Sequence, residues 1–164
     1  MTELKQGLPP VACTDARVLI LGSLPGEASL KAERYYAHPQ NHFWRLLSCV
    51  LGEELAALPY AERLALLQER RIALWDVIAR ARRHGSLDSE LRDIEARDLP
   101  AFAASLPALR AIAFNGQTAA KLGRRALGPS PLALIDLPSS SPAFTLPFAA
   151  KAERWAELRA WLLD

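Results

Sequence analysis

The 164-residue sequence is short of cysteine, and this shortage excludes several kinds of site. It contains only Cys13 and Cys49, too few for a disulfide framework and too few for an iron–sulfur cluster, which normally takes four thiolates. No group of histidines, cysteines and carboxylates has the spacing of a zinc site. We therefore expect a protein without a metal or a cofactor. Cys49 falls on an apolar helical face and is predicted to be buried.

Long apolar runs and a strong net charge are also missing. No segment is long enough to span a bilayer and no basic, apolar leader is present, so we expect a cytoplasmic protein without a membrane partner. The net charge of +2 is too small to indicate nucleic acid by itself. Basic residues gather at 80–84 and 121–125, where they could be solvated helix faces or a nucleic-acid contact. A monomer is expected.

Four short apolar runs alternate with helical patterns, and this alternation predicts the fold. The runs have the length of buried strands and occupy residues 18–21, 72–75, 111–114 and 132–135. Helices are predicted over residues 42–51, 59–69, 99–106, 117–126 and 149–163. The pattern predicts an α/β protein of three layers, α/β/α, with a central four-stranded parallel sheet whose strands end at one edge.

The remaining segments complete the predicted organisation. Residues 1–16 contain two prolines and are expected to form an irregular arm. The segment 77–88 is expected to begin as a helix and to become a loop at Gly85. No repeat or linker interrupts the chain, so residues 1–164 are predicted to be one domain.

Small and polar residues follow the predicted strands at the edge where they meet. The loop 22–26 could bind a phosphate through backbone N–H groups or form a tight turn, but it lacks the glycines and lysine of the common nucleotide motifs. Asn115 could bond the edge of a nucleobase or form an Asn-Gly turn. The hydroxyl-rich loop of Ser139, Ser140 and Ser141, followed by Pro142, suits phosphate oxygens or forms a plain turn.

The loop between the first strand and the first long helix is the expected active site. Tyr35 and Tyr36 could form a stacking wall for a planar ligand or belong to the core. Asn41 could orient a water or simply cap the helix that follows it. His38 and His42 are candidates for proton transfer or phosphate contact, although a lone loop histidine is more often neither.

Together these motifs resemble the uracil-DNA glycosylase superfamily, from Val18 to the C-terminal helix. Residues 22–26, GSLPG, resemble the first motif of the family, a Gly-x-(Asp/Asn)-Pro-Gly loop. Residues 137–142, LPSSSP, resemble its second motif, which enters the DNA groove. Residues 37–44, AHPQNHFW, resemble the matching stretch of the mismatch-specific uracil glycosylases.

Two departures from the family pattern indicate the branch. Leu24 occupies the position where most members have the Asp or Asn that positions water, and Leu137 the position where many have the His or Asn that stabilises the leaving base. The chain lacks both and so resembles the hypoxanthine-DNA glycosylases, also called DNA-deoxyinosine glycosylases. In that branch the asparagine that corresponds to Asn41 is implicated in catalysis.

The resemblance implies a monofunctional DNA repair glycosylase that flips out deaminated bases, hypoxanthine and also uracil, and hydrolyses the N-glycosidic bond. It implies that Asn41 positions the water and that Ser139 binds a DNA phosphate. The other implied site residues contact the base or enter the groove: Tyr36, Asn115, Gly22, Ser23, Leu24 and Phe43 for the base, and Ser140, Ser141 and Pro142 for the groove. The alternatives are a G·U/G·T mismatch-specific glycosylase and a non-catalytic nucleic-acid-binding relative, which Leu24 and Leu137 favour.

Overall fold

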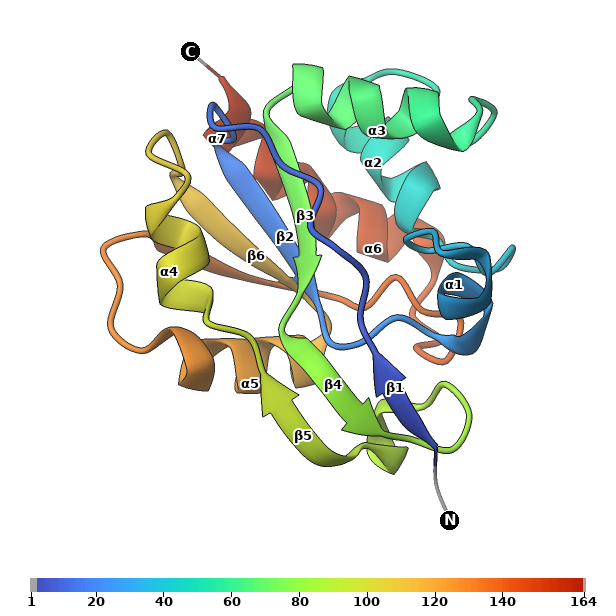
Figure 1. Ribbon diagram of the computed structural model, residues 1–164. Coiled ribbons are helices and arrows are strands. Elements are labelled where there is room, and N and C mark those ends of the chain that lie inside the picture. The colour runs from blue at the N-terminus through green and yellow to red at the C-terminus, as the bar shows by residue number, and fades with distance from the viewer. Residues whose placement is uncertain (1–2, 164) are drawn as a thin grey trace.

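A four-stranded parallel sheet forms the centre of the molecule (Figure 1), a computed structural model that describes residues 3–163. Its strand order is β3-β2-β6-β7, with β2 (Val18–Gly22), β3 (Ile72–Asp76), β6 (Ala111–Asn115) and β7 (Ala133–Leu137). All three strand pairs are parallel. The predicted sheet is confirmed, and the four apolar runs mark its strands to within one or two residues.

Helices cover both faces of this sheet, which confirms the three-layer prediction. On one face lie α2 (Phe43–Leu51), α3 (Tyr60–Glu69) and α6 (Phe148–Trp155), and on the other α4 (Leu99–Ala104) and α5 (Gln117–Leu127). Alternate residues of β2 point to opposite faces of the sheet. Val18 and Ile20 pack in the core under α2, α3 and α6, and Leu19 and Leu21 pack in the core under α4 and α5. A strand buried on both sides must be apolar at every position, which explains its continuous run.

A second, antiparallel sheet was not predicted, and it corrects two expectations. It contains β1 (Leu4–Gln6), β4 (Ile78–Arg82) and β5 (Arg92–Ala96) in the order β1-β4-β5. The segment 77–83 is therefore a strand, and the arm expected to be irregular contributes β1; residues 1–2 of that arm lie outside the described residues. The Ile78 N–H donates to the Ser23 carbonyl at 3.0 Å, so β4 begins against the loop that follows β2.

The helices differ from the sequence prediction at two places. Residues 22–40, expected to be a loop, contain the short helix α1 (Glu27–Ala32), and the C-terminal helix is divided into α6, a 3₁₀ turn over Ala156–Leu158 and α7 (Arg159–Leu162). Asp98 caps α4 as predicted, accepting from the Ala101 N–H at 3.1 Å. Within the described part of the chain, none of the helices has the length and apolar character needed to cross a membrane.

The prediction that Cys49 is buried is wrong. The apolar face of α2 is formed by Phe43, Leu46, Leu47 and Val50 together with Trp44. Cys49 instead lies on the exposed side, one helical turn after exposed Arg45. Residues four apart share a helix face, so the exposure of Arg45 accounts for that of the thiol.

Candidate active site

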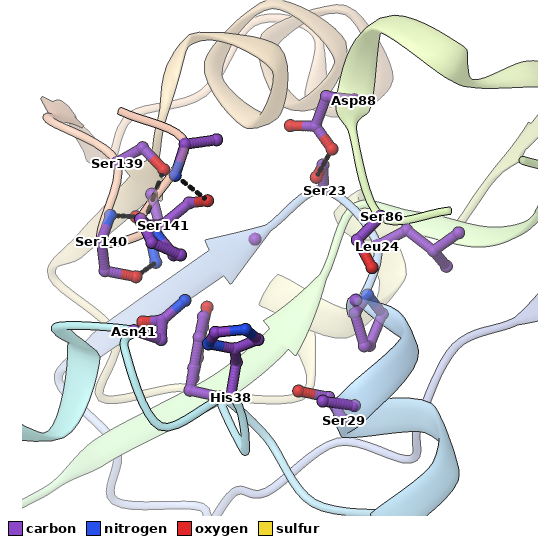
Figure 2. Close-up of a pocket in the computed structure, with 18 of the residues that line it drawn as sticks. Ser23, Leu24, Ser29, His38, Asn41, Ser86, Asp88, Ser139, Ser140 and Ser141 are labelled. Carbon is purple, nitrogen blue, oxygen red and sulfur yellow. Dashed lines mark hydrogen bonds between the residues drawn. The ribbon is translucent and has the colours of Figure 1, made fainter. Parts of the chain in front are cut away.

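A cavity of about 470 Å³ lies at the carboxyl ends of the parallel strands, within the roughly 300–1,000 Å³ typical of ligand pockets. The loops after β2 and β7, the segment before α2 and the loop ahead of β5 surround it, and Figure 2 shows their side chains around it. Of the predicted site residues, ten line it: Gly22, Ser23, Leu24, Tyr36, Asn41, Asn115, Ser139, Ser140, Ser141 and Pro142. Phe43 does not.

Gly22 leaves space that two polar groups of the cavity floor occupy. A Cβ at this position would lie 2.6 Å from Oδ1 of Asp76 and 3.0 Å from the hydroxyl oxygen of Tyr36. Real Cβ atoms essentially never approach another atom this closely. The glycine is therefore required by close approach, and it brings the ends of β2 and β3 together at the cavity.

Arg83 holds the loop 22–26 in place. Its side chain is 1% exposed and donates to the carbonyls of Leu24 at 3.3 Å, Pro25 at 2.5 Å and Gly85 at 2.8 Å. Because three backbone carbonyls occupy the guanidinium, this member of the 80–84 basic cluster is a structural residue and not part of a solvated helix face. Arg80, in the same cluster, pairs with Glu95 on β5.

Leu24 packs into the hydrophobic cluster of the second sheet, with Ile78, Ala81 and Leu91. Only 6% of the residue is exposed. A hydrocarbon side chain in this position cannot orient a water, and Leu137, likewise buried, cannot donate to a leaving base. The two usual catalytic side chains of the motifs are thus replaced by core residues.

Tyr36 presents an aromatic ring to the cavity, and Phe43 supports it from behind. The two rings stack at a centroid distance of 3.7 Å with an interplanar angle of 16°. Phe43 is completely buried, so its predicted direct contact with a base is wrong: it contacts the ring that lines the cavity. Tyr36 adopts a left-handed backbone conformation, φ 54°, which is uncommon for a residue other than glycine and is often found at functional sites.

Asn41 lies one residue before the N-cap His42, and its side chain both bonds the start of α2 and borders the cavity. Its Oδ1 accepts from the Phe43 N–H at 2.9 Å, satisfying one of the free donors at the start of α2. Its side chain also lies beside His38 at the cavity, as Figure 2 shows. The two roles considered for Asn41 are therefore compatible, since capping uses only the amide oxygen.

The two histidines of this segment have different surroundings. His38 lines the cavity, and its Nδ1 accepts from the Gln40 N–H at 3.1 Å. His42 is not among the lining residues; its ring packs edge-on against Phe148, and desolvation lowers its pKa. Its backbone N–H donates to the Ser140 carbonyl at 2.9 Å. His42 therefore connects the two motif loops through its backbone.

Asn115 and Ser140 form a reciprocal hydrogen-bonded pair. The Asn115 Nδ2 donates to the Ser140 hydroxyl and its Oδ1 accepts from the Ser140 N–H, both at 2.9 Å. Ser140 is buried, so its hydroxyl faces Asn115 and not the outside, which removes it from the predicted groove contacts. Contact between Asn115 and a base edge remains a prediction, because one amide hydrogen and one lone pair are not used by Ser140.

The second motif loop is stiffened from within and ends in an exposed tip. The Ser139 hydroxyl accepts from the Ser141 N–H, and the Ser141 hydroxyl from the Ala143 N–H, both at 3.1 Å. Buried Lys151 of α6 donates to the Ser141 carbonyl at 3.3 Å. Pro142, Ala143 and Phe144 are exposed beyond these bonds, so a rigid, apolar tip stands at the rim of the cavity.

Two carboxyl groups that the sequence does not predict as site residues also line the cavity. Asp88, in the 3₁₀ turn Asp88–Glu90, accepts from the Ser23 hydroxyl at 2.8 Å (Figure 2). Asp76 ends β3, is 3% exposed, and its buried Oδ2 has no hydrogen-bond partner among the described residues. Burial raises the pKa of Asp76 to about 7 against the opposing effect of Arg97. The feature of the sequence that could have indicated Asp76 is its position at the end of an apolar strand, which Asn115 shares.

Within residues 3–163, no three or more His, Cys, Asp or Glu side chains are grouped so that they could hold a metal ion. The site is thus built from an aromatic ring, amides, hydroxyls, backbone N–H groups, the buried carboxyl of Asp76 and the more exposed carboxyl of Asp88. Such a set can receive a planar, polar ligand and supply hydrogen bonds to it.

Comparison with known proteins assigns this arrangement to a family. The model of the Uracil DNA glycosylase superfamily matches residues 9–162, and the chain belongs to that superfamily. It is 37% identical to a hypoxanthine DNA glycosylase of Methanosarcina barkeri over 155 residues, 93% of this chain and 96% of that protein. It is 41% identical to another of Methanosarcina acetivorans over 116 residues, 71% of this chain and 73% of that one.

A solved structure supports the same assignment. The solution NMR structure of a Methanosarcina acetivorans protein, provisionally named a uracil DNA glycosylase, superimposes with a TM-score of 0.84 at 36% sequence identity. The match covers 98% of this chain and 99% of that one. The predicted family and its three-layer fold are thereby confirmed.

Proposed function

We propose that this protein is a DNA repair glycosylase that excises deaminated bases, hypoxanthine above all. The proposal depends on the composition of the cavity. Leu24 and Leu137 stand where the usual catalytic side chains would be, while Asn41 and Tyr36 line the cavity and can take their place. The two relatives that are 37% and 41% identical to the chain are named hypoxanthine DNA glycosylases. The protein acts as a monomer and needs no metal or cofactor.

The proposed reaction begins when the damaged nucleotide leaves the helix and its base enters the cavity. Tyr36 stacks on one face of the base, since Phe43 fixes its ring from behind. Asn41 orients a water toward the anomeric carbon with the part of its amide that does not cap α2. Backbone N–H groups of residues 22–26 help to stabilise charge on the departing base.

A panel of duplex oligonucleotides tests this function. Deoxyinosine, deoxyuridine and thymidine are placed opposite each normal base, incubated with the protein in EDTA, and the abasic product is cleaved with alkali. We expect release of hypoxanthine opposite every base. Release confined to G·U and G·T pairs would favour a mismatch-specific enzyme, and binding of the lesion without any base release would favour a non-catalytic relative.

Ser139 is proposed to bind a phosphate beside the lesion. It lies half-buried at the cavity, and we expect Ser139→Ala to weaken DNA binding roughly fivefold, the loss of about one hydrogen bond, with the lesion preference intact. Fluorescence anisotropy with inosine-containing and undamaged duplexes measures both. Ser130→Ala, which removes a hydroxyl bonded to the Leu132 N–H outside the cavity, serves as control. A change in lesion preference would contradict the phosphate role.

Phe144 is proposed to fill the space that the flipped base leaves in the helix. It is 45% exposed at the tip of the second motif loop, and an apolar side chain inserted between base pairs offsets the cost of unstacking. We expect Phe144→Ala to lower kcat/KM roughly tenfold on inosine paired with cytosine and much less on single-stranded substrate, where little unstacking is needed. The neighbouring exposed residue supplies the control Thr145→Ala. Equal losses on both substrates would contradict this role.

A further inference from the structure

Asp76 is a buried carboxyl at the cavity floor with unused hydrogen-bonding capacity. It lies at the end of β3, in register with Gly22 on β2, and lines the cavity. Its Oδ1 and the Tyr36 hydroxyl occupy the space that glycine leaves free at position 22, while its Oδ2 is buried without a partner among the described residues. A buried polar atom without a partner is costly, which points to a ligand.

Charged groups surround Asp76 on several sides, but burial has the largest effect on it. Arg97 and Arg83 lower its pKa and Asp88 raises it, whereas desolvation raises it most, to about 7. The phenol groups of Tyr35 and Tyr36 are close enough for Asp76 to raise their pKa values, and the Tyr35 hydroxyl donates to the Pro9 carbonyl. Both arginines have other partners. The Arg97 Nη2 donates to the Leu8 carbonyl and its guanidinium lies over the Trp75 ring, while its buried Nε has no hydrogen-bond partner among the described residues. Arg83 donates to backbone carbonyls. Near neutral pH a large fraction of the carboxyl therefore carries a proton.

We propose that Asp76 recognises the 6-oxo edge of the flipped base and stabilises its departure by donating its carboxyl O–H to the exocyclic oxygen. The inference rests on the proposed excision of hypoxanthine. As the C1′–N9 bond breaks, its electron pair passes to the base, and the negative charge spreads over the ring to O6. A fixed donor at that oxygen stabilises the charge where it develops, as a carboxylic acid kept neutral by burial is able to do.

The remaining atoms of the reaction are supplied by water. Water gives its hydroxyl to C1′, its other proton ends on the released base, and the carboxyl of Asp76 is unchanged at the end. This donor takes the place of the His or Asn side chain that many members of the family have at the position of Leu137. The protonated carboxyl of Asp76 also disfavours the binding of adenine. The amino group at C6 of adenine presents hydrogens where hypoxanthine presents a lone pair, and a buried donor facing a donor is unfavourable.

The test compares wild type, Asp76→Asn and Asp76→Ala by kcat/KM between pH 5.5 and 9. The substrates are duplexes with deoxyinosine or with deoxynebularine, whose purine base lacks a substituent at C6. We expect Asp76→Ala to lose about 10²-fold on deoxyinosine and far less on deoxynebularine. Asp76→Asn, which keeps the shape and an N–H donor, stays within roughly tenfold of wild type. Wild-type activity falls above about pH 7, and this fall is absent in Asp76→Asn.

Three results would overturn the proposal. Equal losses on the two substrates would mean that Asp76 only supports the structure. Activity that rises with pH, together with an Asp76→Asn variant as weak as Asp76→Ala, would mean that the carboxylate acts as a base. In both cases the proposed function would stand, because wild type still releases hypoxanthine. A wild-type protein that releases none would overturn the function and this inference together.

Discussion

Replacing Asn41 with alanine is expected to reduce the excision of hypoxanthine by about 10²–10³-fold, the usual cost of removing one preorganised polar group from an active site. Asn41 borders the cavity, and Leu24 and Leu137 at the usual catalytic positions cannot orient a water in its place. Single-turnover kinetics on inosine-containing duplex measures the chemical step apart from product release.

The helix cap complicates this experiment, because Asn41→Ala also removes the acceptor for the Phe43 N–H. Losing an N-cap acceptor costs about 1 kcal/mol of stability. Asn41→Ser is the matched control, since a serine hydroxyl caps a helix as well as an amide does but lacks the amide N–H₂ group that is proposed to hold the water. We expect Asn41→Ser to unfold like wild type and to be as inactive as Asn41→Ala.

The opposite pattern would assign Asn41 to structure alone. If Asn41→Ser were as active as wild type while Asn41→Ala lost both stability and activity, the residue would act as a cap and the chemistry would lie elsewhere in the cavity. Robust activity of both variants would remove Asn41 from the mechanism altogether.

The parallel sheet could be predicted because three of its strands, β2, β3 and β6, are buried on both faces. Such strands consist of continuous apolar residues, as in β2, and their short length distinguishes them from helices. The layers and the common edge of the strands then follow from the connections. For the same reason the predicted loops converge on one cavity in the structure.

The second sheet could not be predicted because a bulged strand imitates a helix. The pairing of β4 with β5 is irregular on both sides of Arg80, and a bulge inserts an extra residue into one strand. The buried residues of β4, Ile78 and Ala81, are therefore three positions apart instead of two. That spacing is typical of a helix face.

Residues of the cavity could be predicted where a polar side chain follows an apolar strand or stands in a loop rich in polar and aromatic residues, and not where only three-dimensional burial identifies them. Asn41 and Asn115 stand out in the sequence, and both line the cavity. Phe43 was misplaced because sequence does not tell which of two neighbouring aromatic rings faces the ligand. Asp76 follows a strand like many acidic residues, and its importance depends on burial and on the glycine opposite it.

Replacing Asp76 with asparagine is expected to stabilise the protein at alkaline pH. In the unfolded chain an aspartate titrates near pH 4, whereas in the folded protein burial raises the pKa of Asp76 to about 7. Between these values the folded state binds more protons than the unfolded state, so the free energy of unfolding of wild type falls as pH rises from about 4 to about 7. The loss is about 2–4 kcal/mol, and the neutral amide of Asp76→Asn avoids it.

Urea unfolding of wild type and Asp76→Asn between pH 4.5 and 8.5 measures this difference. The two proteins should be nearly equally stable at the acid end and diverge toward pH 7, with a constant gap above it. Asp136→Asn, at an exposed carboxylate paired with Arg124, should change stability by less than about 1 kcal/mol. Parallel curves for wild type and Asp76→Asn would show that Asp76 is not protonated in the folded protein.

The stability experiment and the kinetic experiment on Asp76 report the same proton. Because kcat/KM reflects the pKa values of the free protein, its decline in wild type should occur at the pH where the stability difference reaches its plateau. Coincidence of the two would mean that the chain keeps a group that destabilises it at physiological pH, as is common where function requires an unusual protonation state. A decline at another pH would assign the kinetic proton to a different residue of the cavity.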